Sequence, residues 1–303
     1  MKMRILFFFF ALITVNCQEQ SKVKIEYPEG DKILYSEYVN EFKDRLFLFS
    51  IDEWKEYEIP LEGIQIHDIG GKFSPDGKKI LVKGKNYTDD IYIYDLRTSN
   101  WQKIFLPALN HPGENSCPFF DFLDDSTVVF DGLFNFFIIS LKTGELIDNL
   151  AATDTFYIWS FDTNRDANLL YLNVGPPMAG FNNIPMNFIV YNYKKREFFN
   201  YIQNTGYFRF WIKGTSNLFI ISDLSFLNIE TGEKSFIEFK NIPVDSIIYA
   251  QSKFIDRNRF LILKKEYTVF ENDFYLYDFT NNSIKRLTYS RSNKTLMDVY
   301  SED

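Results

Sequence analysis

The sequence predicts an all-β fold, a single six-bladed β-propeller built from four-stranded antiparallel blades. Three observations lead to this prediction. Aromatic residues make up 18% of the chain, with 33 Phe and 19 Tyr, and they fit a half-buried pleated strand better than a helix. A polar turn between two apolar runs recurs along the chain at roughly the length of one propeller blade. No long segment has the i, i+3, i+4, i+7 apolar spacing of an amphipathic helix.

Residues 1–16 are predicted to be a signal peptide that precedes the fold. Lys2 and Arg4 come before the apolar run from Ile5 to Val15, which is the order of a secretory signal. A run of about eleven residues is too short to cross a ~30 Å hydrocarbon core as a helix. The run ends Ile13-Thr14-Val15-Asn16-Cys17, which resembles a bacterial lipobox. The resemblance implies that Cys17 becomes the lipidated first residue; the alternative is a leader cysteine without a role.

The predicted organisation is therefore a signal peptide over 1–16, a lipidated tether over 17–22 and a propeller over 23–303. Cys17 and Cys117 are the two cysteines of the chain, so acylation of Cys17 excludes an intramolecular disulfide. Cys117 is then expected to be a small buried hydrophobe. More than one acyl chain gives stable anchoring, so we expect a membrane-bound protein of the bacterial envelope, periplasmic or at the outer membrane or surface.

The charge of the chain excludes one class of partner. The formal net charge is −8, and without Lys2 and Arg4 the mature chain has 31 basic and 41 acidic residues, a balance of −10. Phosphate backbones are bound through basic patches or stripes, and the sequence has none. Nucleic acid is therefore not expected as a partner, and the chain is expected to be a monomer.

The clearest blade lies between Asp68 and Leu106. Ser74-Pro75-Asp76-Gly77 is a tight-turn sequence, because Pro fixes φ and Gly accepts a positive φ. It separates two apolar runs and so predicts a hairpin. Ile91–Tyr94 is the expected third strand, and Trp101–Leu106 the fourth. Asp76 and Asp95 are expected to cap their own turns rather than to act as acids or ligands.

The turn between third and fourth strands recurs six times, with starts 45, 45, 52, 36 and 50 residues apart. The copies begin at Ser50, Asp95, Ser140, Asn192, Asn228 and Asp278. The turn after the first strand recurs more loosely at Pro28–Asp31, Leu123–Ser126, Asn164–Ala167, Lys213–Ser216 and Asp256–Arg259. Two segments could supply the innermost strand of the first blade, Val23–Tyr27 or Met297–Ser301. Either choice gives six blades.

These repeats carry a family resemblance. Phe73–Ile80, which reads FSPDGKKI, followed by IYIYDLRT from Ile91, resembles the repeat of TolB-type six-bladed propellers, and the resemblance covers approximately residues 23–292. It implies a ring of sheets around a central channel. Propellers of this type serve as envelope scaffolds and as domains of peptidases, so the resemblance implies a fold and leaves the function open. TolB itself has an additional N-terminal α/β domain, for which we expect no room before Val23.

Two long loops are the candidate binding surface. Short hairpins on one face of a propeller leave the long connections on the other face, and long loops in compact domains often carry function. The loop over 175–187 holds the adaptable apolar side chains Met178, Phe181, Ile184 and Met186. The loop over 106–118 holds His111. The alternative is that the first loop is a tolerated insertion and that His111 has no special role.

Metal chemistry in the channel is the rival interpretation. Asp68, Asp121 and Asp162 lie near or on predicted innermost strands, where a cluster could hold a divalent cation as in propeller lactonases. The sequence has no Gly-x-Ser-x-Gly, His-Glu-x-x-His or phosphate-binding Gly-rich motif, and its two histidines make a nucleophilic triad improbable. No metal site or cofactor is assigned, and a binding role is favoured over catalysis.

The sequence thus predicts a membrane-anchored envelope lipoprotein whose propeller binds a protein or peptide partner. A metal-dependent hydrolase or lactonase with its site in the channel is the first alternative. A glycan-binding module is the second, and it would present exposed Tyr or Trp rings along a groove.

Overall fold

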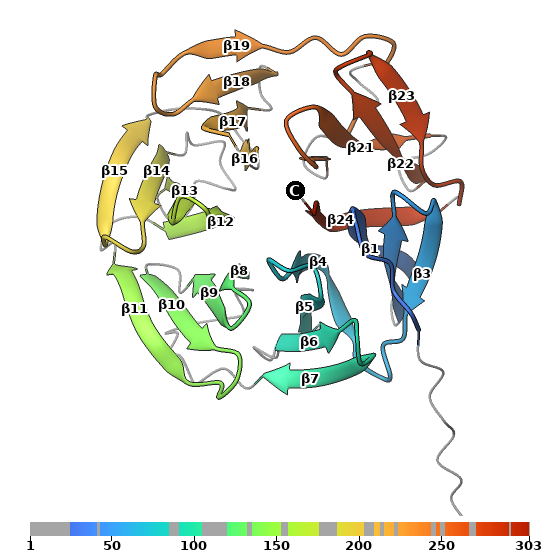
Figure 1. Ribbon diagram of the computed structural model, residues 1–303, viewed down its shortest axis with the longest axis horizontal. Helices are drawn as coiled ribbons and strands as arrows, with labels where there is room; N and C mark the ends of the chain where they lie inside the picture. The colour runs from blue at the N-terminus through green and yellow to red at the C-terminus, as the bar shows by residue number, and fades with distance from the viewer. Residues whose placement is uncertain are drawn as a thin grey trace, which may run out of the picture.

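The computed structural model describes residues 25–40, 43–84, 91–104, 120–131, 135–152, 157–175, 187–202, 209–212, 215–220, 224–243, 247–248, 252–266, 271–290 and 292–302. Within these ranges the chain forms six four-stranded antiparallel sheets arranged as a ring (Figure 1). The predicted six-bladed β-propeller is confirmed.

Each blade is a meander of four strands that succeed one another from the channel outward. Blade 1 is β24 (Asn293–Tyr300), β1 (Lys32–Asn40), β2 (Lys43–Ser50) and β3 (Lys55–Ile59). Blade 2 is β4 (Ile66–Phe73), β5 (Lys79–Gly84), β6 (Ile91–Asp95) and β7 (Asn100–Ile104). Blade 3 is β8 (Phe120–Asp124), β9 (Thr127–Asp131), β10 (Asn135–Ser140) and β11 (Leu146–Ala152).

The other three blades repeat this order. Blade 4 is β12 (Tyr157–Asn164), β13 (Leu169–Gly175), β14 (Asn187–Asn192) and β15 (Glu197–Ile202). Blade 5 is β16 (Arg209–Trp211), β17 (Asn217–Ile220), β18 (Ser225–Asn228) and β19 (Lys234–Phe236). Blade 6 is β20 (Lys253–Phe254), β21 (Arg259–Lys265), β22 (Asn272–Asp278) and β23 (Ser283–Arg286).

Burial changes from strand to strand in step with the sequence pattern. The second strand of a blade lies between neighbouring sheets, and β5 accordingly reads as a continuous apolar run with Ile80, Leu81 and Val82 fully buried. In the outer strand β7, by contrast, Asn100, Gln102 and Lys103 are exposed and Ile104 is buried. A strand covered on both faces must be apolar throughout, whereas an edge strand needs one apolar face.

The predicted turns between third and fourth strands are all present at the six expected places. Their leading Asp, Asn or Ser caps the turn, as the Asp95 carboxylate shows by accepting hydrogen bonds from the backbone N–H groups of Arg97 and Thr98 at 2.9 and 3.0 Å. Asp76 accepts from the Lys78 N–H at 3.0 Å. These aspartates therefore shape turns, as predicted.

The C-terminal strand closes the ring. β24 pairs with β1 in an antiparallel register that runs from Lys32 opposite Tyr300 to Tyr38 opposite Asn293. Of the two segments considered, the C-terminal one thus supplies the innermost strand of blade 1, while Ile25–Tyr27 forms no strand. Pro28–Asp31 was expected to be a turn after a first strand. It instead leads into β1, because the first strand of this blade comes from the other end of the chain.

A buried charged cluster fixes the start of β24 against blade 6. Lys294 is fully buried, and its ammonium group donates to the Asp273 carboxylate at 3.0 Å and to the carbonyl oxygens of Asn272 and Ser290 at 2.8 and 2.7 Å. Asp273 also accepts from Thr288 at 2.7 Å and from Arg286. We call Lys294, Asp273, Asn272, Arg286 and Thr288 the closure cluster.

The hydrophobic core is divided among the spaces between blades. Six clusters of buried side chains each join two adjacent blades. Between blades 1 and 2, for example, Leu34 and Leu48 pack with Ile80 and Tyr94. Burial of one large apolar side chain contributes about 1.5 to 3 kcal/mol, so each of these clusters stabilises the contact between its two blades.

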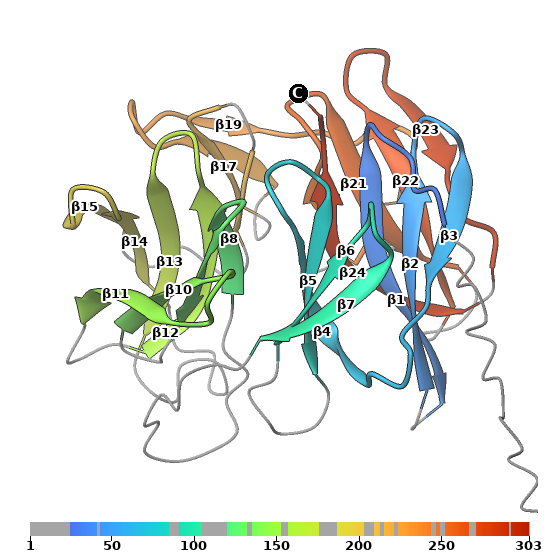
Figure 2. The same cartoon turned by 60° about the horizontal axis from the view of Figure 1, so that its bottom comes forward.

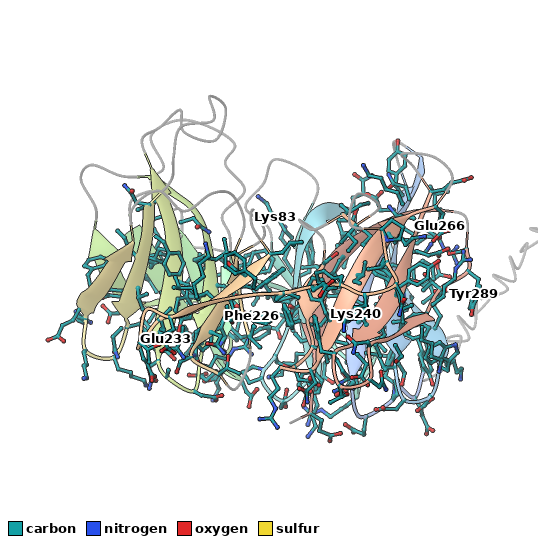
Figure 3. All side chains as sticks on the ribbon, turned by 90° about the horizontal axis from the view of Figure 1, so that it is seen from above. Lys83, Phe226, Glu233, Lys240, Glu266 and Tyr289 are labelled. Carbon is teal, nitrogen blue, oxygen red and sulfur yellow. The ribbon has the colours of Figure 1, made fainter. Side chains whose placement is uncertain are left out.

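Among the described residues, the exposed large hydrophobic side chains are Tyr38, Val39, Leu146, Ile147, Phe198, Phe236 and Tyr289. Tyr289 projects from the rim of blade 6 (Figure 3) and is 68% exposed. None of the described residues belongs to a helix that is long and apolar enough to span a membrane. The predicted signal peptide and the predicted tether around Cys17 lie outside the described residues.

Candidate functional site

A cavity of about 300 Å³ opens at the mouth of the central channel. It lies at the face where the hairpins between first and second strands emerge and where the chain ends (Figure 2). All six blades contribute to its wall, through residues that include Lys72, Phe73, Asp121, Asp162, Arg165, Asp166, Trp211, Lys253 and Asp298. A small molecule or a single inserted side chain would fit a space of this size.

Five charged residues of the wall occupy the same position in five different blades. Each lies on the innermost strand, opposite the third residue of the second strand of its blade. The pairs are Lys72 with Leu81, Asp121 with Val129, Asp162 with Tyr171, Lys253 with Leu261 and Asp298 with Leu34. We call these five residues the channel ring. Side chains alternate along a strand, so this register points all five into the channel.

The aspartates of the channel ring connect each blade to the next. The Asp298 carboxylate of blade 1 accepts from the Phe73 backbone N–H of blade 2 at 2.9 Å. The Asp162 carboxylate of blade 4 accepts in the same way from the Trp211 N–H of blade 5 at 3.2 Å. Because the innermost strands have no further strand to pair with, these carboxylates satisfy backbone donors at the channel wall.

Asp121 is the most strongly paired member of the ring. It is 3% exposed, and it forms ion pairs with Arg165 at 2.8 Å and with Lys72 at 3.7 Å. Thr163 donates a hydrogen bond to it at 2.5 Å. Burial raises the pKa of Asp121, but the charges of Lys72 and Arg165 outweigh burial and hold the pKa below its ordinary value.

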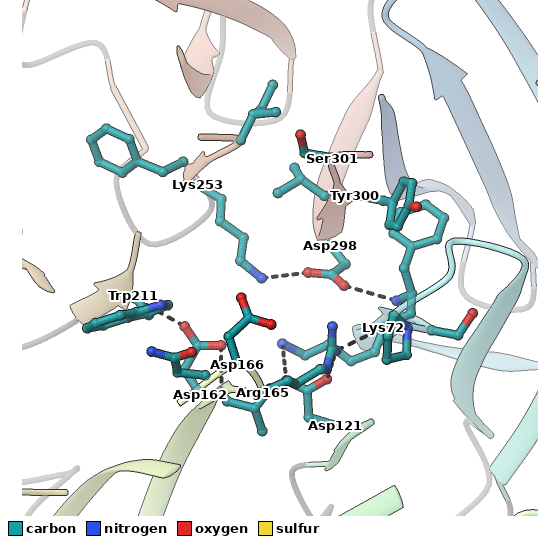
Figure 4. A pocket seen from close by; sticks show the side chains of 18 of the residues that line it. Lys72, Asp121, Asp162, Arg165, Asp166, Trp211, Lys253, Asp298, Tyr300 and Ser301 are labelled. Carbon is teal, nitrogen blue, oxygen red and sulfur yellow. Dashed lines mark hydrogen bonds and ion pairs between the residues drawn. The ribbon is translucent and has the colours of Figure 1, made fainter. Parts of the chain in front are cut away.

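The basic groups of the cavity are also matched by carboxylates. Burial lowers the pKa of Lys72, but the charges of Asp121, Asp298 and Asp162 raise it above its ordinary value, so this lysine is a cation at neutral pH. Lys253 of blade 6 forms an ion pair with Asp298 of blade 1 at 2.5 Å. Each of the three basic groups therefore faces at least one carboxylate (Figure 4).

Two carboxylates of the cavity lack such a match. Asp162 accepts from the backbone N–H groups of Thr163 and Trp211, and no lysine or arginine of the described residues lies within ion-pair distance of it. Asp166 is exposed on the hairpin after β12, and its carboxylate projects toward the middle of the cavity (Figure 4). The cavity thus combines paired charges on one side with unmatched carboxylates on the other.

The sequence offered Asp68, Asp121 and Asp162 as candidate metal ligands in the rival interpretation. Asp121, Asp162 and Asp298 reach the same cavity from three blades, but basic side chains separate them. Among the residues that the structure describes, no group of three His, Cys, Asp or Glu side chains is placed to hold a metal ion. The side chain of Asp68 lies outside the described residues.

The predicted binding residues are not placed by the structure. Met178, Phe181, Ile184 and Met186 fall in the gap at 176–186, and His111 falls in the gap at 105–119, so all five lie outside the described residues. They remain predictions, as does lipidation of Cys17.

Sequence reasoning selected two members of the channel ring, Asp121 and Asp162, and missed the other three. A usable signal was present, because each ring residue stands shortly before a hairpin turn, as Lys72 does before Ser74-Pro75-Asp76-Gly77. Aligning the blades on these turns would have placed lysine and aspartate in one column. Arg165 and Trp211 could not be found this way, because they reach the cavity from neighbouring positions.

Comparisons with known proteins agree with the fold. No protein-family model and no curated protein matches the sequence. Among solved structures, TolB from Acinetobacter baumannii has a TM-score of 0.45 and 12% identity, over 89% of this chain and 54% of that chain. This chain thus spans about half the length of that TolB. An oligogalacturonate lyase from Vibrio parahaemolyticus has a TM-score of 0.49 and 13% identity, over 86% and 73%.

At these identities the likeness concerns the fold alone. The six blades and their strand order define a six-bladed β-propeller, as the blade repeat predicts, and the repeat around Ser74–Gly77 resembles that of TolB-type propellers.

Proposed function

We propose that this chain is a lipid-anchored protein of the bacterial envelope whose propeller is a rigid platform for a protein or peptide partner. The observation that supports a binding role is the cavity at the channel mouth, which receives side chains from all six blades. A site assembled from every blade is held in place by the whole ring, and preorganisation of this kind favours binding.

The position of the cavity adds a second surface to the one predicted from the loops. The loop residues Phe181 and Met186 were expected to contact the partner, whereas the cavity opens at the face of the short hairpins. The sequence predicts the loop surface on the face opposite the short hairpins, where long loops often carry function.

Capture of a partner by designed variants tests the proposal. Purified protein is immobilised and exposed to solubilised envelope extract, and bound proteins are compared between wild type and Asp166→Arg. The new arginine reverses a charge at the cavity mouth without touching the core, so partner recovery is expected to fall at least tenfold. Asp125→Arg is the matched control, because Asp125 lies on the equivalent hairpin of blade 3 and outside this cavity.

A second variant separates the two surfaces. If Phe181→Ser with Met186→Ser abolishes capture and Asp166→Arg does not, the loop face is the binding surface. If neither variant changes what is captured, the binding platform is rejected at both places.

Membrane anchoring is tested through Cys17. Cells labelled with an alkyne analogue of palmitate should incorporate the label into wild type, and Cys17→Ser should abolish it and move the protein to the soluble fraction. Labelling of the Cys17→Ser protein would contradict the assignment.

A further inference from the structure

The charges of the cavity define what kind of group it can receive. Lys72 and Arg165 share Asp121, and Lys253 has Asp298, so these basic groups are already occupied. An entering anion would have to compete with those carboxylates. An entering cation meets Asp162 and Asp166, which form no direct ion pair among the described residues, although the charge of Asp162 raises the pKa values of Lys72 and Arg165.

Trp211 provides an independent indication that a polar ligand belongs in this space. It is 8% exposed and lines the cavity beside Asp162, and one face of its indole ring stacks on Tyr171 with ring centroids 4.7 Å apart. Its backbone N–H donates to Asp162, yet no described residue accepts a hydrogen bond from the indole N–H. The indole nitrogen is not fully enclosed by protein atoms, so this donor faces the open space of the cavity, where a ligand oxygen can accept from it.

We propose that the cavity binds one ammonium or guanidinium group, with Asp162 and Asp166 as acceptors and Trp211 as the wall beside it. A cation held by two carboxylates forms charge-assisted hydrogen bonds, the stronger class of such bonds. The size of the cavity, about 300 Å³, suits a lysine or arginine side chain rather than a folded surface.

The inference deepens the proposed function, since a partner peptide would carry the cation on a basic side chain that enters the channel mouth. A free small amine offers the same chemistry. The two sources share the ammonium group, but only the peptide has carbonyl oxygens beside it. One of these oxygens would accept a hydrogen bond from the indole N–H of Trp211.

Binding of small probes to the purified full-length protein tests the inference without the partner. The chain has four tryptophans, and the indole N–H signal of Trp211 in a ¹H–¹⁵N spectrum is assigned by its loss in Trp211→Phe. The probes are Nα-acetyl-lysine methylamide, the norleucine analogue that lacks the charge, putrescine, and inorganic phosphate. The lysine probe should shift the Trp211 signal in a saturable way, and the norleucine analogue should not.

Substitutions assign the acceptors. Asp162→Asn should weaken binding of the lysine probe roughly tenfold or more, the size expected when a charge-assisted hydrogen bond is replaced by a neutral one. Asp166→Asn should weaken it by less, because that carboxylate is exposed and screened by water. Asp125→Asn makes the same charge change on the neighbouring hairpin and should leave binding unchanged.

Tighter binding of the lysine probe than of putrescine supports a peptide as the source of the cation, and the reverse order supports a free amine. Equal binding of the norleucine analogue, a Trp211 shift with phosphate alone, or unchanged affinity in Asp162→Asn overturns the inference. Loss of partner capture in Asp166→Arg with no binding of any amine probe would leave the binding platform standing and reject the cation site.

Discussion

Strand β24 takes part in two charged clusters, one near each of its ends, and the two differ in how completely they are satisfied. Near its start, Lys294 is fully buried, and its ammonium group donates to three oxygens, one each from Asp273, Asn272 and Ser290. Near its end, Asp298 belongs to the channel ring, where the cavity remains open beside it. The same types of side chain thus stabilise the ring at one end and line a site at the other.

The difference shows how to separate structural from functional charge in this fold. A buried ion that has every hydrogen bond filled contributes to ring closure, and removing one partner leaves an uncompensated charge. A carboxylate that faces a cavity without a cation contributes little to folding and is available to a ligand. The cost of neutralising each group should therefore fall from the closure cluster to the cavity mouth.

The largest effect is expected for Lys294→Met. Loss of the buried ammonium group leaves Asp273 and two carbonyl oxygens short of a donor, so unfolding free energy should fall by about 3 to 5 kcal/mol. Urea denaturation, monitored by tryptophan fluorescence, measures this free energy of unfolding. The exposed Lys240→Met is the control and should change stability by less than about 0.5 kcal/mol. Equal losses in the two variants would refute a closure role.

Asp121→Asn is expected to have the second largest effect. It leaves Lys72 and Arg165 without their shared carboxylate, which should destabilise the ring by about 2 to 3 kcal/mol at pH 7. The lowered pKa of Asp121 adds a pH dependence. A carboxyl with a lower pKa in the folded state stabilises the fold above its unfolded pKa, about 4, and loses that contribution as the pH falls through the folded value.

The stability difference between wild type and Asp121→Asn should therefore be largest near neutral pH and shrink as the pH falls below about 4. Urea midpoints measured at several pH values between 3 and 7 provide the curve, with the exposed Glu238→Gln as the matched carboxylate control. A difference that stays constant over this range would show that Asp121 does not act through its charge.

Asp162→Asn should cost about 1 kcal/mol or less. The amide oxygen of Asn can still accept the Trp211 N–H that Asp162 accepts at 3.2 Å, so the link between blades 4 and 5 is preserved. Thermal unfolding should show a small decrease in Tm, while binding of the lysine probe falls strongly. A loss as large as that of Asp121→Asn would place Asp162 with the structural charges instead.

The smallest effect is expected for Asp166→Asn. This residue is exposed and its carboxylate forms no hydrogen bond within the described part of the chain, so stability should stay within about 0.5 kcal/mol of wild type. Tm measured at low and high salt checks this. A clear change would mean that the Asp166 carboxylate stabilises the fold, as Asp121 does, rather than being a group offered to a ligand.

Much of the fold could be predicted because its turns and buried strands depend on short stretches of sequence. The turn at Asp95 recurs in six blades, since Asp, Asn or Ser caps the backbone within three residues of itself. Runs such as Ile80-Leu81-Val82 mark strands that are covered on both faces. Neither signal requires knowledge of any residue more than a few positions away, which is why blade number and strand order followed directly.

The site was harder to predict because its residues are distant in the sequence. Asp121 and Asp162 were recognised as possible channel residues, but the ion-pair partners of Asp121, Lys72 and Arg165, come from other blades and could not be predicted. The choice between Val23–Tyr27 and Met297–Ser301 for the closing strand was open for the same reason. Both segments are short, and pairing with β1 depends on geometry around the whole ring.

The blade repeat, the capped turns and the candidate export signal are properties of neighbouring residues, so the amino-acid order carries them. Which strand closes the ring, which carboxylates are paired and which are left facing the cavity depend on six blades meeting at one axis. Charges from five innermost strands are brought within reach of one another only there. Their Coulomb energy varies with distance and burial, and neither quantity exists until the ring has closed.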